Sequence, residues 1–242
     1  MKPVRFVMTA LALALALPAF ADDPAPPPAD PLSFNVSLTT DYRYRGISQT
    51  RLKPALQGGA DYAFDSGFYV GTWLSTIKWI KDAGGDAPVE WDIYGGYKTE
   101  IAKGISIDVG LLQYAYVKNK LNPSANTLEG YGAITIGVLT AKYSLSGTNL
   151  FGFADSKKSG YLDLSATLDV GEGFTVVPHY GHQEVRHLGA ASYNDMSVTV
   201  NKDLAGFTWG AAVIGTDAKG YYGPNGKDLG KTSLVVSVKK TF

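Results

Sequence analysis

YLDLSATLDV, residues 161–170, alternates apolar and polar side chains without a break. Successive side chains of an extended strand point to opposite sides, so the leucines, the alanine and the valine of this stretch share one face. The tyrosine, the aspartates, the serine and the threonine share the other face. A helix would repeat its apolar residues about every 3.6 positions, which this stretch does not do. We therefore predict a strand with one apolar face and one polar face.

The same alternation recurs along the chain. Most of the segments that show it are about 10–12 residues long, which is the length of a tilted strand that crosses a bilayer. The fifth segment changes phase near Leu112, where we expect a β-bulge. The twelve segments are 34–45, 54–64, 67–79, 89–100, 104–117, 127–137, 140–146, 159–170, 173–183, 193–203, 206–217 and 231–242.

The connections between these segments alternate between two lengths, with five very short turns and six longer loops. Outer-membrane barrels have short turns at the periplasmic end, longer loops outside and an even number of strands. The barrel must close, because hydrocarbon offers no partner to the unpaired backbone groups of a sheet edge. The pattern predicts an all-β fold, a closed up-and-down antiparallel transmembrane β-barrel of about 12 strands over residues 34–242.

A soluble β-sandwich or propeller would also show alternation and regularly spaced turns. Its strands are usually about 5–6 residues long, which is shorter than most of the segments here. Many segments also carry charged residues on the second face, so that face must contact water. Both features favour the barrel.

The first 33 residues differ in composition from the rest. A short basic start precedes an apolar run over residues 6–17, and Ala-Phe-Ala at 19–21 has the small-x-small pattern of a signal-peptidase site. We expect residues 1–21 to be a signal peptide that is cleaved after Ala21; an uncleaved anchor helix is the alternative. Residues 22–33 are expected to form a Pro-rich, disordered lead-in, because proline removes backbone donors.

Composition excludes several classes of function. The chain has 22 Lys and Arg against 22 Asp and Glu, so it lacks the basic excess of a nucleic-acid-binding protein. It contains no cysteine, which excludes disulfides and thiolate metal sites. No G-x-S-x-G elbow, Walker loop or H-E-x-x-H motif occurs, and His179 and His182 fall on opposite faces of one predicted strand. We expect no enzymatic activity, no cofactor and no metal ion.

Charged residues on the polar faces are the candidates for lining a pore. Asp41, Arg43 and Arg45 alternate along the first segment, so neighbouring members lie roughly 6–7 Å apart on one face. We expect this ladder to form part of a charged constriction, or else a structural salt-bridge network with acids from neighbouring strands. Inward acids outnumber inward bases on this assignment, which suggests a mild preference for cations. The further pore-lining candidates are Asp61, Asp92, Lys98, Glu129, Lys142 and Asp163.

Aromatic residues gather on the apolar faces, many of them near segment ends. Girdles at the two membrane interfaces explain such positions, so we expect contacts with outer-membrane lipid and lipopolysaccharide. The chain ends in Phe242 on an apolar face, and a terminal aromatic residue is expected to be recognised by the barrel-assembly machinery. The predicted girdle residues are Tyr42, Tyr44, Tyr62, Phe64, Phe68, Trp91, Tyr97, Phe174, Tyr180, Phe207 and Trp209.

Several blocks of the sequence resemble one bacterial family. They read TTDYRYRGISQT at 39–50, PALQGGADY at 54–62, SGFYVGTW at 66–73, EWDIYGGY at 90–97 and VVSVKKTF at 235–242. These blocks resemble the TorF-type porin family, which is also described as a bacterial outer-membrane protein family of unknown function. The resemblance implies a porin-like barrel in the outer membrane of a Gram-negative bacterium. It supplies no catalytic residues and no agreed solute.

These features predict a porin-like channel for passive diffusion of small hydrophilic solutes, with selectivity set by lumen charges and outer loops. Two other functions stay open. A barrel enzyme acting on lipid or lipopolysaccharide would need a serine, a histidine and an acid or amide near the outer rim. Its candidates are His182, His187, Ser159 and Ser192. A closed structural or adhesion barrel would conduct no ions. The sequence does not indicate an oligomeric state.

Overall fold

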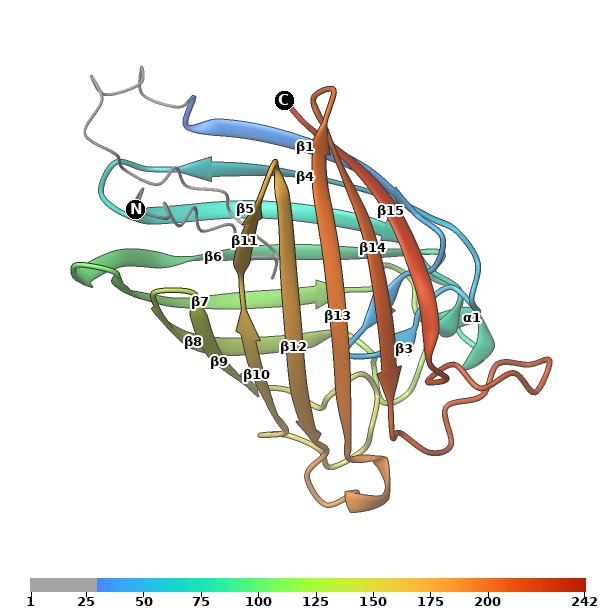
Figure 1. The fold of residues 1–242 in the computed structure, drawn as a ribbon. Coiled ribbons are helices and arrows are strands. Elements are labelled where there is room, and N and C mark those ends of the chain that lie inside the picture. Colours follow the sequence, from blue (N-terminus) through green and yellow to red (C-terminus); the bar gives the residue numbers. More distant parts are fainter. Residues whose placement is uncertain (1–29) are drawn as a thin grey trace.

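The computed structural model describes residues 30–242, whose strands close into a barrel (Figure 1). The predicted signal peptide and most of the Pro-rich lead-in lie outside the described residues. The strands are β1 (Leu32–Thr39), β2 (Arg43–Tyr44), β3 (Ile47–Ser48), β4 (Ala55–Ala63), β5 (Phe68–Thr76), β6 (Val89–Ala102), β7 (Ile105–Ala115), β8 (Thr127–Ile136), β9 (Leu139–Ser146), β10 (Gly160–Ala166), β11 (Leu168–Gly171), β12 (Phe174–Glu184), β13 (Tyr193–Leu204), β14 (Phe207–Thr216) and β15 (Ser233–Thr241). A helical turn α1 (Trp79–Asp82) and a 3-10 turn η1 (Gly189–Ala191) lie in the loops.

All strands except β2 and β3 belong to one antiparallel sheet. β10 and β11 are two parts of one strand that is interrupted at Thr167, and both pair with β12, so the barrel wall has twelve strands. β1 pairs with β15, and β10 pairs with β9 on its other side, so the sheet closes on itself. The predicted closed barrel of twelve strands is confirmed.

The wall separates an apolar exterior from a polar interior. In β1, Phe34 and Leu38 are 49% and 52% exposed, whereas Asn35 and Ser37 are half-buried on the other face. An exterior of exposed aliphatic and aromatic side chains suits lipid rather than water. Among residues 30–242, no helix is long and apolar enough to cross a membrane. The predicted girdle residues that are exposed on this exterior are Tyr62, Phe64, Phe68, Trp91, Phe174, Tyr180, Phe207 and Trp209.

Short turns gather at one end of the barrel and long loops at the other. The short turns span residues 64–67, 103–104, 137–138, 172–173 and 205–206. The six long connections, called the outer loops below, span residues 40–54, 77–88, 116–126, 147–159, 185–192 and 217–232. β1 begins and β15 ends at the end with the short turns, as their backbone hydrogen bonds between Phe34 and Phe242 show. The predicted alternation of connection lengths is confirmed.

The first predicted segment, 34–45, is wrong at its C-terminal end. β1 ends at Thr39, and the chain then turns into the barrel instead of continuing along the wall. Tyr42 and Tyr44, predicted to contact lipid, therefore lie inside. The Tyr42 ring packs 5.4 Å from that of Trp73, and the Tyr44 ring packs 5.5 Å from that of Tyr114. A short hairpin inside a barrel alternates like a wall strand, so periodicity alone does not distinguish the two.

The expected β-bulge at Leu112 is also wrong. β7 keeps a continuous register with β6 and β8 through this position. Leu112 faces the interior, where it is buried in an apolar cluster to which α1 and its loop contribute Ile77 and Ile80. Its apolar character is therefore explained by packing against an outer loop. The outer loops fill part of the barrel interior with an apolar core.

Two inward tyrosines lie directly over glycines of the neighbouring strand. Tyr69 is the cross-strand partner of Gly96, and Tyr131 is the partner of Gly110. A Cβ added to either glycine would lie 2.5 Å from the hydroxyl oxygen of its tyrosine. The missing side chain lets each ring lie against the wall. The Tyr69 hydroxyl donates to Asp108 at 2.6 Å, which fixes the ring in that position.

Candidate functional site

A two-residue turn directs the first outer loop into the barrel. Tyr44 of β2 pairs with Ile47 of β3, and Arg45 and Gly46 between them have φ angles of 46° and 79°. Two successive positive φ values are typical of a type I′ turn, in which glycine is favoured. The turn packs against the wall, because a Cβ at Gly46 would lie 2.7 Å from Cβ of Asp195. Residues 43–48 are called the inward hairpin below.

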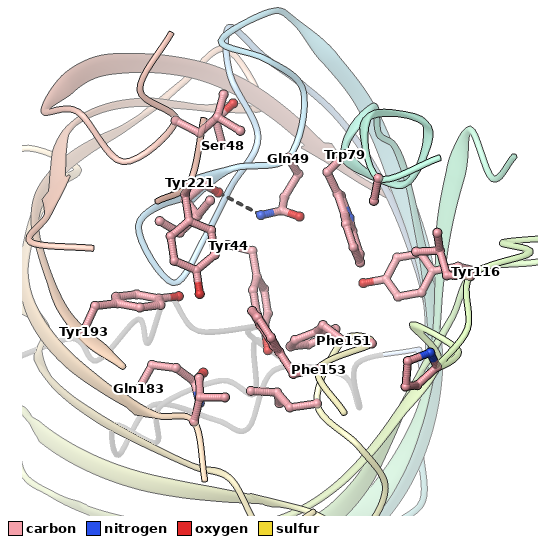
Figure 2. A pocket seen from close by; sticks show the side chains of 18 of the residues that line it. Tyr44, Ser48, Gln49, Trp79, Tyr116, Phe151, Phe153, Gln183, Tyr193 and Tyr221 are labelled. Carbon is pink, nitrogen blue, oxygen red and sulfur yellow. Dashed lines mark hydrogen bonds between the residues drawn. The ribbon is translucent and has the colours of Figure 1, made fainter. Parts of the chain in front are cut away.

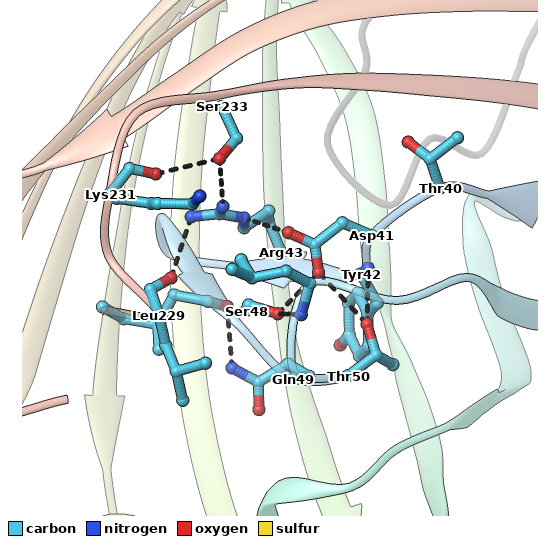
Figure 3. A network of polar contacts seen from close by, with 12 residues as sticks. Thr40, Asp41, Tyr42, Arg43, Ser48, Gln49, Thr50, Leu229, Lys231 and Ser233 are labelled. Atoms are coloured by element: carbon cyan, nitrogen blue, oxygen red, sulfur yellow. Dashed lines mark hydrogen bonds and ion pairs between the residues drawn. The ribbon is translucent and has the colours of Figure 1, made fainter. Parts of the chain in front are cut away.

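Arg43 joins the inward hairpin to the outer end of β15 (Figure 3). Its Nε donates to Asp41 Oδ2 at 2.5 Å, and its Nη2 donates to Ser233 Oγ at 2.9 Å. Its Nη1 donates to the carbonyl oxygens of Gly46 and Leu229 at 2.8 and 2.9 Å. Every nitrogen of the guanidinium group therefore has an acceptor. Arg43 acts as a structural link between two outer loops rather than as a free charge.

Arg45 crosses the interior from the tip of the hairpin to the wall. Its Nη2 donates to Glu129 Oε2 of β8 at 2.7 Å, and its Nη1 donates to Gln183 Oε1 of β12 at 2.7 Å. The guanidinium carbon lies 4.1 Å from the ring centre of Tyr161 and 4.8 Å from that of Tyr44. The Arg45 and Glu129 side chains are 6% and 2% exposed, so the ion pair is buried. Breaking such a pair is costly, because it leaves one buried charge without a partner.

The predicted ladder of Asp41, Arg43 and Arg45 along one strand is wrong, because these residues lie on a loop and its hairpin. The alternative, a salt-bridge network, describes the observed contacts. Arg43 pairs with Asp41 within one loop, and Arg45 pairs with Glu129 from another strand. Of the predicted pore-lining residues, Arg45 and Glu129 are the two that the fold brings together across the interior.

Four other candidates project inward from the wall. All four are half-buried, so water in the lumen reaches part of each side chain. Asp61 accepts a hydrogen bond from the Tyr94 hydroxyl, and Asp163 lies 3.5 Å from His179. Lys142 lies 3.9 Å from the ring centre of Tyr131, and Lys98 is the cross-strand partner of Asp108. These contacts place charged groups of both signs along the wall.

Asp92 is covered more deeply than a pore-lining group should be. It is 1% exposed, and its Oδ1 has no hydrogen-bond partner among residues 30–242. Glu90, two positions earlier on β6, accepts hydrogen bonds from the hydroxyls of Tyr42 at 2.5 Å and Tyr116 at 2.7 Å. Both tyrosines come from outer loops. The two carboxyl groups are therefore sealed beneath the loops rather than open to the passage.

The residues considered for a lipid-directed enzyme do not form a catalytic pair. The Ser159 and Ser192 hydroxyls bond to backbone groups, and His182 and His187 bond to an asparagine and an aspartate. None of the hydrogen bonds of the described chain joins either serine to either histidine. His179 faces the interior and His182 the exterior, so the two lie on opposite faces of the strand, as predicted. Within residues 30–242, no group of three or more His, Asp and Glu side chains could hold a metal ion.

A pocket of about 440 Å³ lies between the inward hairpin and the outer loops (Figure 2). Trp79, Tyr116 and Phe151 line one side of it, and Tyr193 and Tyr221 line the other. Burial raises the pKa of Tyr221 to about 12, so this hydroxyl is neutral at physiological pH. The other described lining residues are Tyr44, Ile47, Ser48, Gln49, Ala83, Leu121, Asn122, Pro123, Leu150, Gly152, Phe153, Gln183, Val185 and Leu229. The described lining thus contains no Asp, Glu, Lys, Arg or His.

Basic residues are concentrated in the outer loops. Of the 22 Lys and Arg of the chain, 14 lie in these six loops, against six of the 22 Asp and Glu. Lys118, Lys120, Lys157 and Lys158 are exposed on two loops that follow each other around the rim. The loop end therefore carries a net positive charge, and the rest of the chain carries a net negative charge. A field of this sign attracts anionic groups to the loop end.

Sequence analysis identified both members of the buried ion pair but not the residues that surround it. Gln183 holds Arg45 in place from β12, and Tyr44 and Tyr161 cover its guanidinium group. Tyr161 shares the polar, inward face of its predicted segment, and this alternation was the sequence feature that could have identified it. Only the closed fold shows that strands β8, β10 and β12 present side chains to one arginine.

The barrel is similar to solved porin structures. The KdgM porin matches with a TM-score of 0.57 and 10% identity, over 87% of this chain and 99% of that chain. A KdgM porin in complex with disordered oligogalacturonate matches with a TM-score of 0.55 and 10% identity, over 87% and 98% of the two chains. The NanC porin matches with a TM-score of 0.53 and 11% identity, over 87% and 98%. At these identities the likeness concerns the fold.

A family model described as "Bacterial protein of unknown function (Gcw_chp)" matches residues 23–242. No curated protein matches the sequence. The expected resemblance to a bacterial family of unknown function is confirmed, and so is the porin-like fold that it implied. The TorF-type assignment stays a prediction.

Proposed function

This chain belongs to the Gcw_chp family of bacterial proteins of unknown function, and we propose that it is an outer-membrane channel for passive diffusion of small hydrophilic solutes. The observation that carries the proposal is the inward hairpin, whose Arg45 reaches across a closed barrel to Glu129. A folded-in loop that is held by ionic contacts narrows a lumen at a defined place. Permeation would then depend on the size of the solute at the hairpin and on the charges of the lumen.

The charges of the lumen favour cations in this proposal. Arg43 and Arg45 are neutralised by Asp41 and Glu129, so they add no net charge to the passage. Among the other inward residues, carboxylates outnumber ammonium groups. Glu90 and Asp92 are sealed beneath the loops and are left out. The remaining acids are Asp61, Asp108, Asp163 and Asp195, and the bases are Lys98, Lys142 and Lys239. We expect a weak cation preference, measured as a reversal potential across a salt gradient.

The expected partners follow from the two surfaces of the barrel. The apolar exterior would contact outer-membrane lipid, and the exposed lysines of the outer loops would contact the phosphate groups of lipopolysaccharide. Phe242 ends the chain beside β1, where the barrel-assembly machinery would recognise it. We expect the loop end to lie outside the cell, after export that is directed by residues 1–21 and ends with cleavage after Ala21.

Reconstitution of the purified chain tests the proposal. We expect stepwise ion currents in a planar bilayer, and swelling of proteoliposomes in small neutral solutes such as glycerol and arabinose but not in raffinose. A heat-denatured sample gives the background. Bilayers that contain the folded barrel but show neither current nor swelling would contradict a channel.

One observation supports the rival function of a closed structural or adhesion barrel. The outer loops form a buried apolar cluster inside the barrel, in which Ile77, Ile80 and Tyr116 are at most 2% exposed. A barrel closed by this cluster would hold no continuous water path. The bilayer experiment separates the two functions, because the closed barrel gives no current at any salt concentration.

A further inference from the structure

We infer that the pocket between the inward hairpin and the outer loops is a binding site for an uncharged aromatic compound that carries one hydrogen-bonding substituent. The inference rests on the proposed channel, whose entrance the pocket would form, and it narrows the class of solute that the channel takes up. It is drawn from the shape of the pocket, the chemistry of its walls and the residues that it shares with the surroundings of the buried ion pair.

Two aromatic walls give the pocket its shape. Trp79 packs edge-to-face on Tyr116 with ring centres 5.1 Å apart, and Tyr193 packs in the same way on Tyr221 with ring centres 5.6 Å apart. The two pairs lie on opposite sides of the pocket in Figure 2, with Phe151 beside the first pair. Aromatic rings gain from both offset-stacked and edge-on contacts with a further ring. Tyr44 lies between the two walls in Figure 2, so a flat ring that enters the pocket meets aromatic surface there.

The lining selects against charge. Its described residues include seven Tyr, Phe and Trp side chains but no Asp, Glu, Lys, Arg or His. An ionised ligand would lose its hydration without gaining a partner of opposite charge, which opposes its binding. The positive charge of the outer loops attracts anions to the loop end of the barrel. The described lining of the pocket, however, has no basic side chain that could bind them. Neutral molecules should therefore bind in the pocket more tightly than charged ones.

A few unused polar groups define the substituent. The Tyr193 hydroxyl points into the pocket in Figure 2 and makes no hydrogen bond among residues 30–242. The Gln49 side chain donates through Nε2 to the Ile47 carbonyl oxygen, and its Oε1 accepts no hydrogen bond within the described chain. An unused hydroxyl and an unused acceptor suit a small group such as a carboxamide. A sugar carries many hydroxyls and would leave most of them without partners on these walls.

The pocket is connected to the ion pair by shared residues. Gln183 lines the pocket, and its Oε1 accepts from Arg45 at 2.7 Å. Tyr44 also lines the pocket, and its ring lies 4.8 Å from the Arg45 guanidinium carbon. A bound molecule therefore rests on the residues that hold Arg45 against Glu129. A solute captured here is held at the entrance to the narrowed lumen.

Binding is tested on the full chain in detergent by calorimetric titration with benzamide. Four compounds serve as controls. Benzoate and benzylammonium are charged aromatic compounds, cyclohexanecarboxamide carries the same substituent on a non-aromatic ring, and glucose is a neutral sugar. We expect benzamide to bind at least about tenfold more tightly than each of these four. Equal or tighter binding of any of them overturns the proposed ligand class.

Phe153 is the side chain to remove, because it lines the pocket and makes none of the ring contacts that join the other aromatic residues. We expect Phe153→Ala to weaken benzamide binding about tenfold and Phe153→Leu to weaken it less. Tyr222→Ala is the matched control, because Tyr222 is an exposed outer-loop aromatic outside the lining, and it should bind like the wild type. Heat-dependent gel mobility confirms that each barrel is folded. Unchanged binding by folded Phe153→Ala overturns the site.

The same samples separate this inference from the proposed function. Current in a bilayer without benzamide binding overturns the site and leaves the channel. Benzamide binding without any current overturns the channel and leaves a ligand-binding barrel. When both hold, benzamide added to the loop side should interrupt single-channel current in the wild type and less often in Phe153→Ala. Benzamide binding with uninterrupted current would place the pocket off the path and overturn its role as the entrance.

Discussion

Arg45, at the tip of the inward hairpin, donates to Glu129 of β8 at 2.7 Å, and both side chains are buried. The hairpin belongs to the first outer loop, which Arg43 attaches to β15. In the order of strands around the barrel, β8 lies opposite β15. One ion pair therefore holds a loop across the barrel. Its loss should affect both the stability of the fold and the width of the passage.

The ion pair gives the first prediction. Arg45→Gln and Glu129→Gln each leave one buried charge unpaired, so each should lower the free energy of unfolding by about 3–5 kcal/mol. The double variant should lose less than the sum of the two, because no lone charge remains. Urea unfolding in lipid vesicles measures these values. Arg51→Gln is the control, since Arg51 is 39% exposed where it pairs with Asp82, and such surface pairs contribute about 1 kcal/mol or less. Additive losses in the double variant would show that the two residues do not act as a pair.

The second prediction concerns the link made by Arg43. Arg43→Lys keeps the charge, but one ammonium group cannot reach the four acceptors that the guanidinium group bonds. The inward hairpin should become mobile, and chymotrypsin should cut after Tyr44 several times faster than in the wild type. Lys231→Gln changes a charge in the adjoining loop without removing one of these bonds, so its cleavage rate should not change. Cleavage of Arg43→Lys at the wild-type rate would show that other contacts hold the hairpin.

A third prediction compares two glycines of the wall. Gly96→Ala places a Cβ 2.5 Å from both the Tyr69 hydroxyl oxygen and the Val109 carbonyl oxygen, so the backbone must shift. Overpacking of this kind costs about 1–3 kcal/mol and should lower the temperature at which the barrel loses its compact gel mobility. Gly132→Ala is the matched control, because its new Cβ meets only a Val109 methyl carbon at 3.9 Å. Equal melting of the two variants would argue against close packing of Tyr69 on the wall.

The fourth prediction concerns alkaline pH. Burial, and then the nearby Glu90 carboxylate, raise the pKa of Tyr116 well above its ordinary value of 10.0. Above pH 10 the unfolded chain loses this proton while the folded barrel keeps it, so stability should fall as pH rises above about 10 and should not change below it on this account. Unfolding at several pH values between about 9 and 12 measures the slope. Tyr116→Phe should have a shallower slope, whereas Tyr222→Phe, which changes an exposed tyrosine, should not. Identical slopes for all three proteins would contradict the assignment.

Local alternation was sufficient to predict most of the wall. Segments such as 173–183 and 193–203 agree with β12 and β13 to within one residue at each end, because an apolar outer face and a polar inner face impose a period of two on every wall strand. The same rule misplaced residues 40–45, where a hairpin inside the barrel alternates as a wall strand does. It also misread Leu112, because an inward apolar residue is expected only when an outer loop packs against it.

The sequence by itself determined that the chain forms a barrel, how many strands form its wall and which wall residues face inward, because each of these depends on neighbours within about ten positions. Tertiary structure alone decided that Arg45 meets Glu129 and Gln183, and that Trp79 and Tyr221 line one pocket. Those contacts join residues more than 80 positions apart. They depend on closure of the sheet and on the path of the outer loops inside it, which no local pattern of polarity encodes.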